Sequence, residues 1–337
     1  SGRAHPCPDR RRAPGRGVLP GRCYFTASPA GSLDPRHGSR GEDTTAGTSP
    51  YQLKFLGTGG GRFVVTRQVR ASGGLWLQLG GIRRLVDPGP GSLVRCLSSR
   101  PRLDPAGFHA ILLSHRHIDH ANDVNILAEA MTEGGRVRRG TLFCPADALE
   151  GDPVVLRYVR GYVGEVVTLR PGGRYAVRAG DEGVVFETPL ALRHSVETYG
   201  FLFYLPFGRL ALVSDTTYFP ELARHYAAEV MVVNVGLLDP SAGGPPHLSL
   251  AGAEALLAEA RPRTAILTHF GMKLLRARPW ELAREMSRRL GLAVLAARDG
   301  MTVDLREAAA GLPAAGAAGA ANAADDPPCE PAFGELS

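Results

Sequence analysis

The stretch Ser114-His115-Arg116-His117-Ile118-Asp119-His120 decides the fold of this chain. It follows directly on the apolar run 110–113, which has the length and composition of a buried strand. Three imidazoles and a carboxylate therefore lie within six residues, where a strand gives way to a loop. Imidazole nitrogen and carboxylate oxygen suit zinc and related divalent ions, so this spacing predicts metal binding rather than a loop with surface histidines. Side chains beyond a strand end need not alternate, so one segment can reach two ions.

Three further candidate ligands lie downstream, each at or near the end of a predicted strand. They are His194, Asp215 and His269. Taken singly, each is more typical of an ordinary polar strand terminus. Together with the first cluster they supply enough nitrogen and oxygen ligands for two metal sites.

The candidate ligands lie between two terminal segments of different composition. Residues 1–48 are rich in Pro, Gly, Arg and Ser and lack hydrophobic periodicity, which predicts a disordered N-terminal extension. Residues 308–337 repeat Ala, Gly and Pro without a pattern and predict a disordered C-terminal tail. We therefore expect one domain over residues 49–307.

Short strands dominate the first part of this domain, and helices alternate with strands in the last part. Helices are predicted over 123–131, after the N-cap residue Ser249, and from Pro279. Two strand-rich halves with helices to cover them predict an α/β fold made of layers of sheet and helix. Strands are predicted over 51–56, 75–79, 83–87, 110–113, 166–169, 184–187, 201–205, 210–213, 230–234 and 264–267.

Composition favours a globular protein without a membrane partner. The 337 residues are 44% hydrophobic and 21% charged, and no run approaches the roughly 20 apolar residues of a membrane span. No apolar segment follows the early arginines as in a secretory signal, so a cytoplasmic protein is expected. The net charge is +6, and the +4 and −4 of the two terminal segments cancel, which leaves a mild basic bias. Free thiols are predicted for Cys7, Cys23, Cys96, Cys144 and Cys329, which form no CxxC pair.

The order HxHxDH, then His, then Asp, then His resembles the metallo-β-lactamase superfamily of hydrolases, over residues 49 to about 305. The resemblance implies a four-layer αββα sandwich with mixed sheets and two metal ions at the rim between them. It also implies that Asp87 supports the site from outside the ligand set, although an aspartate before Pro88 could equally start a turn. The implied ligands are His115, His117 and His194 for one ion, Asp119, His120 and His269 for the other, and Asp215 as the bridge.

A two-metal site implies hydrolysis, because ions roughly 3.5–4 Å apart lower the pKa of a shared water and hold the oxygens of an in-line displacement. Asp215 occupies the position where the best-known zinc β-lactamases carry cysteine, which argues against antibiotic hydrolysis. His117 occupies the position where the similar flavodiiron oxidoreductases carry glutamate, which argues against that branch. Zinc is the favoured metal, with manganese or iron as alternatives, because imidazole and carboxylate accept all three.

Further motifs resemble ribonuclease Z and the cyclic phosphodiesterase (PhnP-like) branch near it. The glycine-rich stretch 57–61 matches their opening, whose amides would line a phosphate pocket, with a plain turn as the alternative. His247 precedes a helix, as does the histidine that donates a proton to the leaving oxygen in ribonuclease Z; alternatively, it only flanks the helix. Ser195, Thr198 and Tyr199 resemble substrate contacts, or they are loop residues whose hydroxyls bond local backbone.

The long Gly-Pro arm by which ribonuclease Z grips transfer RNA is not evident in this sequence. Residues 152–170 carry a few arginines and could form a smaller lid. Only Tyr158 and Tyr162 alternate with those arginines, too few for an extended nucleic-acid track. A small cyclic or nucleotide-like phosphodiester is therefore favoured over nucleic acid.

The sequence thus predicts a metal-dependent phosphodiesterase in which a hydroxide shared by two metal ions attacks phosphorus. Asp119 and His247 are the predicted catalytic residues, with His247 as the proton donor to the leaving group. The alternative is a carboxyl ester, lactone or thioester hydrolase on the same dinuclear site. A tRNA 3′-processing endonuclease and a non-catalytic metal-stabilised binding protein rank below both. The sequence leaves a monomer and a homo-oligomer open.

Overall fold

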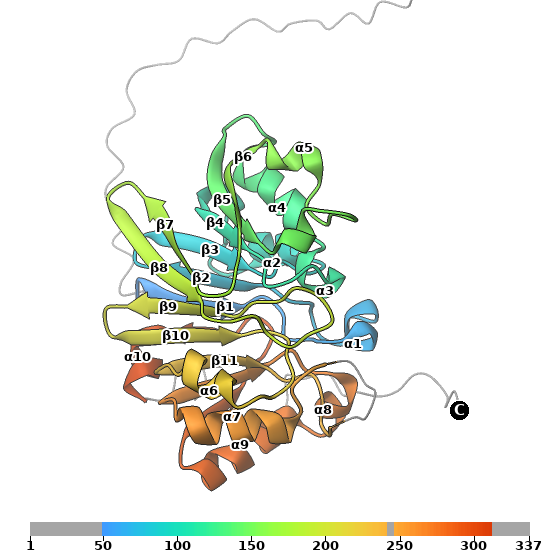
Figure 1. The fold of residues 1–337 in the computed structure, drawn as a ribbon, viewed down its shortest axis with the longest axis vertical. Coiled ribbons are helices and arrows are strands. Elements are labelled where there is room, and N and C mark those ends of the chain that lie inside the picture. The colour runs from blue at the N-terminus through green and yellow to red at the C-terminus, as the bar shows by residue number, and fades with distance from the viewer. Residues whose placement is uncertain (1–48, 241–245, 312–337) are drawn as a thin grey trace, which may run out of the picture. The chain divides into compact units, whose positions relative to one another are not determined.

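Two seven-stranded mixed sheets carry the site between them (Figure 1). The computed structural model describes residues 49–240 and 246–311. The first sheet consists, in spatial order, of β14 (Thr302–Asp304), β1 (Tyr51–Phe55), β2 (Leu75–Leu79), β3 (Ile82–Val86), β4 (Ala110–Leu112), β5 (Arg139–Cys144) and β6 (Val163–Thr168). Neighbours from β3 to β6 pair parallel, and the other pairs are antiparallel.

The second sheet repeats this mixed pattern. Its spatial order is β13 (Ala293–Ala296), β12 (Thr264–Thr268), β11 (Val230–Asn234), β10 (Gly208–Val213), β9 (Phe201–Leu205), β8 (Glu182–Thr188) and β7 (Gly173–Ala179). Neighbours from β10 to β13 are parallel, and the pairs from β7 to β10 are antiparallel. Each sheet therefore has one parallel half, whose strands all end at the same edge.

Helices cover the outer faces of both sheets, as Figure 1 shows. Separate apolar clusters lie under the helices of each sheet, and a third fills the space between the sheets. This arrangement confirms the four-layer αββα sandwich predicted from the sequence. The helices on the first sheet are α2 (Ser92–Ser98), α4 (Val124–Met131) and α5 (Arg157–Arg160), and those on the second are α6 (Glu221–Tyr226), α7 (Leu250–Ala260) and α9 (Pro279–Leu290).

The short helices lie mainly in loops near the site end of the sheets. They are α1 (Arg62–Thr66), α3 (Ile118–Ala121) and α8 (Met272–Arg276), while α10 (Leu305–Ala310) follows β14. The 3-10 turns Pro105–Gly107 and Ala146–Ala148 complete the helical elements of the described residues.

The predicted strands and the three predicted helices are all present. The Ser249 hydroxyl accepts a hydrogen bond from the Gly252 amide, which confirms it as the N-cap of α7. Four further strands, β5, β7, β13 and β14, are not predicted by the sequence patterns. Of these, β7 carries Arg174 and Arg178 and β14 is only three residues long, so neither contains a long apolar run.

The predicted boundary of the C-terminal tail is wrong by a few residues. Residues 308–310 belong to α10, which begins where the Asp304 carboxylate accepts hydrogen bonds from the amides of Arg306 and Glu307. Ala308 and Ala309 are buried in the cluster between the sheets, so small apolar side chains order this segment. Residues 1–48 and 312–337 lie outside the described residues, and so do the predictions made for them.

Cys96 and Cys144 are buried free thiols, as predicted. Cys7, Cys23 and Cys329 lie outside the described residues. Among the helices of the described chain, not one has both the length and the apolar character needed to cross a membrane.

Arg84 is a buried cation in the core between the sheets. Its side chain has no exposed surface, and none of its guanidinium nitrogens has a hydrogen-bond partner among the described residues. The guanidinium carbon lies 5.4 Å from the centre of the Phe203 ring. Burial lowers the pKa of Arg84 to about 9, because the charged form loses its hydration.

We predict that Arg84→Met stabilises the protein at pH 7 by about 1 kcal/mol or more, because it removes unsatisfied buried donors. The pKa of Arg84 is lower in the folded chain than in the unfolded one. The destabilisation that comes from burying the charged guanidinium is therefore fully present below pH 9. It is relieved as the pH rises further, and the gain from the substitution should shrink above pH 9. Urea unfolding at pH 7 and pH 10 measures both effects, with the exposed neighbour Arg83→Met as control. A lower stability of Arg84→Met at pH 7 would contradict this account.

Candidate metal centre

The predicted ligands meet at one edge of the sandwich, where the parallel strands of both sheets end. Asp87 follows β3, and residues 114–120 follow β4 in the first sheet. Asp215 follows β10 and His269 follows β12 in the second. Parallel neighbours direct their carboxyl ends to the same edge, and this brings loops from distant parts of the chain together.

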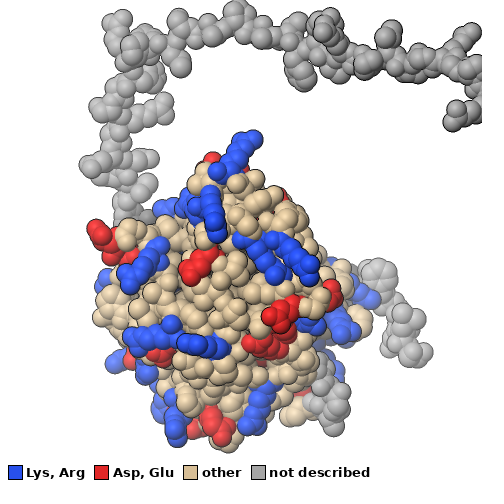
Figure 2. Space-filling view, turned by 45° about the horizontal axis from the view of Figure 1, so that its top comes forward, with Lys and Arg blue, Asp and Glu red and all other residues tan. Residues whose placement is uncertain are grey.

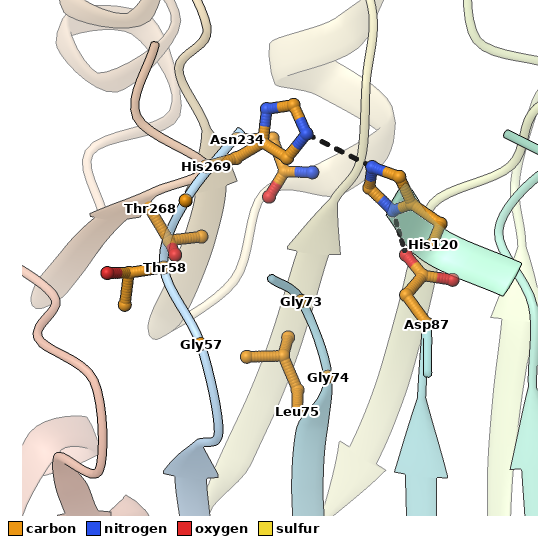
Figure 3. Close-up of a pocket in the computed structure, with 11 residues that line it drawn as sticks. Gly57, Thr58, Gly73, Gly74, Leu75, Asp87, His120, Asn234, Thr268 and His269 are labelled. Carbon is orange, nitrogen blue, oxygen red and sulfur yellow. Dashed lines mark hydrogen bonds and ion pairs between the residues drawn. The ribbon is translucent and has the colours of Figure 1, made fainter. Parts of the chain in front are cut away.

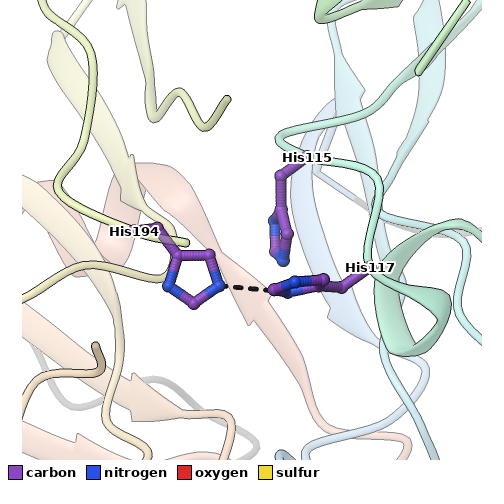
Figure 4. Close-up of side chains that lie close together, drawn as sticks. All are labelled: His115, His117 and His194. Carbon is purple, nitrogen blue, oxygen red and sulfur yellow. Dashed lines mark hydrogen bonds between the residues drawn. The ribbon is translucent and has the colours of Figure 1, made fainter. Parts of the chain in front are cut away.

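His115, His117 and His194 form the first group of candidate ligands (Figure 4). One ring nitrogen of each lies within 4.8 Å of the others. The Nε2 atom of His194 is 3.0 Å from Nδ1 of His117. The group matches the set implied for one ion by the sequence resemblance.

Asp119, His120 and His269 form the second group. Figure 3 shows His120 and His269 facing each other across the edge, with Nε2 atoms 3.1 Å apart. Oδ2 of Asp119 lies 3.5 Å from Nε2 of His269 and 3.9 Å from Nε2 of His120. These three residues match the set implied for the other ion.

Asp215 lies between the two groups and is 1% exposed. Its Oδ2 atom is 3.4 Å from Nε2 of His120, 3.8 Å from Nε2 of His115 and 3.9 Å from Nε2 of His194. Nε2 of His269 lies 3.5 Å from the same oxygen. One carboxylate oxygen thus faces nitrogens of both groups, as a bridging ligand requires.

The hydrogen bonds around three of the histidines determine where their protons lie. Nδ1 of His120 faces the carboxylate of Asp87 at 3.0 Å, and Nδ1 of His194 faces the carbonyl of Pro246 at 2.9 Å. Carboxylate and carbonyl oxygens only accept, so each Nδ1 carries a hydrogen. In the neutral ring Nε2 then presents its lone pair to the centre.

His115 reaches the same tautomer through two serines. The Ser114 hydroxyl donates to Asp87 at 2.7 Å and accepts from Ser214 at 2.8 Å. Having donated its hydrogen, the hydroxyl can only accept from Nδ1 of His115, 2.9 Å away. Nε2 of His115 is buried without a hydrogen-bond partner in the described chain. A buried lone pair without a donor, among others that converge, fits a metal cation.

Asp87 supports this arrangement from outside the ligand set. Its carboxylate accepts hydrogen bonds from the Ser114 amide at 2.6 Å, from the Ser114 hydroxyl and from His120. These contacts fit the supporting role expected from the sequence rather than that of a residue that merely starts a turn.

The charges of the buried cluster are coupled. Burial lowers the pKa of His115 well below its usual value, so this ring is neutral. Burial also opposes protonation of His120, but Asp215 and Asp119 outweigh it and raise the pKa of that ring well above its usual value. Because a ligand nitrogen must be free of its proton, metal binding at His120 has to release one.

The glycine-rich stretch 57–61 holds the His269 loop rather than leaving its amides free. Gly60 donates its amide hydrogen to the Phe270 carbonyl at 3.0 Å, and the Phe270 amide donates to the Thr58 carbonyl at 2.9 Å. The Gly59 amide donates to Ala71. The predicted phosphate pocket therefore loses two of its amide donors. A Cβ atom on Gly60 would lie 2.3 Å from Nδ1 of His269, so only glycine fits.

His247 joins the cluster from the loop before α7. Its Nδ1 atom is 3.4 Å from Oδ2 of Asp215, and its ring stacks on that of His269 with centroids 5.4 Å apart. Burial lowers the pKa of His247 to about 4, although Asp215 opposes the effect. The ring is thus neutral at pH 7 before substrate binds.

Of the three predicted substrate contacts, only Ser195 lies at the centre. Its hydroxyl is 3.4 Å from Nε2 of His117. Thr198 donates to the Val196 carbonyl, and Tyr199 is buried between the sheets. The alternative expectation of local backbone bonding therefore holds for Thr198.

The sequence does not predict that Ser114, Ser214 and Asn234 are partners of the ligands. Asn234 donates to Oδ1 of Asp215 at 2.9 Å from the end of β11. A polar residue at the end of an apolar strand is the only sequence signal, and many strands end in this way.

We predict that Gly60→Ala displaces His269 and weakens metal binding about 10–100-fold, the usual effect of disturbing the support of a ligand. Metal content after dialysis, measured by mass spectrometry, reports the loss. Gly183→Ala on β8 is the matched control, because a Cβ there meets nothing closer than 4.0 Å. Unchanged metal content in Gly60→Ala would contradict the claim that the close contact with Gly60 positions His269 for metal binding.

Comparisons with known proteins agree with this geometry. A curated relative, an uncharacterized protein from Methanocaldococcus jannaschii, is 29% identical over 265 residues, covering 75% of this chain and 95% of the relative. The metallo-beta-lactamase fold protein YhfI from Bacillus subtilis superimposes with a TM-score of 0.59 at 19% identity, covering 75% of this chain and 99% of that one.

Two further solved structures share the fold. A diphosphatase from the PhnP family has a TM-score of 0.53 at 21% identity, covering 75% of this chain and 97% of its own. The short form of human tRNase Z has a TM-score of 0.54 at 16% identity, covering 75% and 98%. A family model described as "Beta-lactamase superfamily domain" matches residues 83–270. Because this match spans more than half of the chain and contains all the His and Asp clusters found among the described residues, the protein belongs to the metallo-β-lactamase superfamily and is a metal-dependent hydrolase.

Proposed function

We propose that this hydrolase is a phosphodiesterase that acts on a small cyclic or nucleotide-like phosphodiester. The observation that carries the proposal is the pair of His and Asp groups joined by Asp215, since two ions are suited to clamp the oxygens of an in-line displacement. The structural likeness to a diphosphatase and to tRNase Z supports phosphorus chemistry at such a site.

We assign the first ion to His115, His117 and His194, and the second to Asp119, His120 and His269, with Asp215 shared. Zinc is the favoured metal. When bound, the ions supply Lewis acidity that makes water a nucleophile near neutral pH and neutralises charge on the phosphoryl oxygens. Asp87 orients His120 directly and His115 through Ser114, and the Pro246 carbonyl orients His194.

Asp119 and His247 are the residues assigned to proton handling. The side chain of Asp119 is 18% exposed, against 1% for Asp215, so Asp119 can accept a hydrogen bond from an attacking water. His247 is 13% exposed and also borders the cluster. A phosphodiester anion beside its ring favours the protonated form, which can then donate to the leaving oxygen.

The arrangement of basic residues favours a small substrate. The Arg160 guanidinium donates to the carbonyls of Leu149 and Val155. This arginine of the predicted lid therefore stabilises its own loop through backbone contacts. Figure 2 shows Lys and Arg scattered among Asp and Glu over the visible face, without one continuous basic track. Binding of a long polyanion would call for such a track.

The low pKa of His247 favours a second candidate function. A neutral ring at pH 7 is a weak proton donor, and an activated carboxyl ester or thioester does not need a strong one. Hydrolysis of a carboxyl ester, lactone or thioester at the same centre is therefore the alternative.

The first test is turnover of bis-p-nitrophenyl phosphate and of a 2′,3′-cyclic nucleotide with zinc or manganese supplied. We predict activity that a chelator abolishes and metal restores, and that Asp119→Ala lowers at least 100-fold without unfolding the chain. Initial rates and circular dichroism measure both. No phosphodiester turnover, combined with rapid hydrolysis of a p-nitrophenyl ester or thioester, would contradict the proposal and favour the alternative.

The second test separates proton donation by His247 from other roles. We predict that His247→Ala lowers kcat about 10²–10⁴-fold for diesters with an alkoxide leaving group, and far less for p-nitrophenolate, which needs no proton. His225→Ala on α6 is the control, because His225 lies outside the clusters. An equal loss for both leaving groups would exclude the proton-donor role.

A further inference from the structure

Asn234 donates a side-chain hydrogen bond to Oδ1 of Asp215, the carboxylate oxygen that does not face the histidines. It ends β11, which lies between β10, the strand that leads to Asp215, and β12, the strand that leads to His269. Its Nδ2 atom is 2.9 Å from Oδ1 of Asp215. A carboxylate can only accept, so the amide nitrogen must be the group that faces it.

The two oxygens of Asp215 therefore have different surroundings. Oδ2 faces five imidazole nitrogens at 3.4–3.9 Å. Oδ1 faces the Asn234 amide instead. Because Asp215 is almost fully buried, water does not compete for this hydrogen bond. Figure 3 shows the amide of Asn234 beside His269 and near the Asp87–His120 pair.

We propose that Asn234 is a positioning residue that makes Asp215 a one-oxygen bridge between the two metal positions. Without the amide, Asp215 could turn and present both oxygens to a single ion, leaving the other position one ligand short. Asn234 would thereby set the affinity for the second ion rather than take part in the reaction. The inference rests on the dinuclear centre and does not depend on the substrate proposed above.

The test measures metal binding without substrate. Asn234→Ala removes the amide, and Asn234→Leu keeps the branching at Cγ but cannot donate. Competition with a zinc-binding dye gives the affinity for each ion, and mass spectrometry gives the number retained. We expect both variants to bind the second ion about 10–100-fold more weakly, with a smaller effect on the first. The activity lost should return when zinc is supplied in excess.

The matched control is Asn122→Ala, because Asn122 donates to the Asp123 carboxylate at 3.0 Å, and Asp123 is outside the ligand clusters. This variant should bind both ions as the unmodified chain does. Wild-type affinity in Asn234→Leu would show that Asn234 only fills space and would overturn the proposal. Loss of both ions to the same degree would overturn it as well. An unmodified chain that binds two ions but hydrolyses no phosphodiester would refute the proposed substrate alone.

Discussion

The structure depends on one electrostatic constraint: buried imidazole lone pairs converge on a carboxylate oxygen at the edge where two sheets meet. Ser114, Asp87 and the Pro246 carbonyl place a hydrogen on Nδ1 of His115, His120 and His194, so in each neutral ring Nε2 presents its lone pair to the centre. Such a cluster is costly to bury unless cations occupy it. Metal binding and folding of this edge are therefore linked, because bound cations offset the free energy lost when these polar side chains are buried.

The sandwich supplies the positions that this constraint requires. Strands that run parallel in each sheet end at the same edge, and the apolar cluster between the sheets packs the two sheets against each other. Close backbone approach, as at Gly60, lets the His269 loop enter the centre. Arg84 shows that the same core also tolerates a buried guanidinium without hydrogen-bond partners among the described residues.

Much of the fold and all seven candidate ligands that the structure brings together could be predicted from the sequence. Residues 114–120 place four ligand types after one apolar strand, and the distal His and Asp residues follow other strands. The serines and Asn234 could not be predicted, because their role depends on which strands become neighbours. Alanines at 308–310 show no hydrophobic pattern in the sequence, yet Ala308 and Ala309 pack into the core between the sheets because their side chains are small. The glycine-rich stretch resembles a phosphate loop, but the amides of Gly59 and Gly60 bond backbone carbonyls.

The central claim is that two cations lie between these groups and share one oxygen of Asp215. Anomalous X-ray diffraction at the zinc edge from crystals of the zinc-loaded protein tests it most directly. We expect two peaks, one among His115, His117 and His194 and one among Asp119, His120 and His269, with Oδ2 of Asp215 between them. A single peak, or peaks away from Asp215, would contradict it.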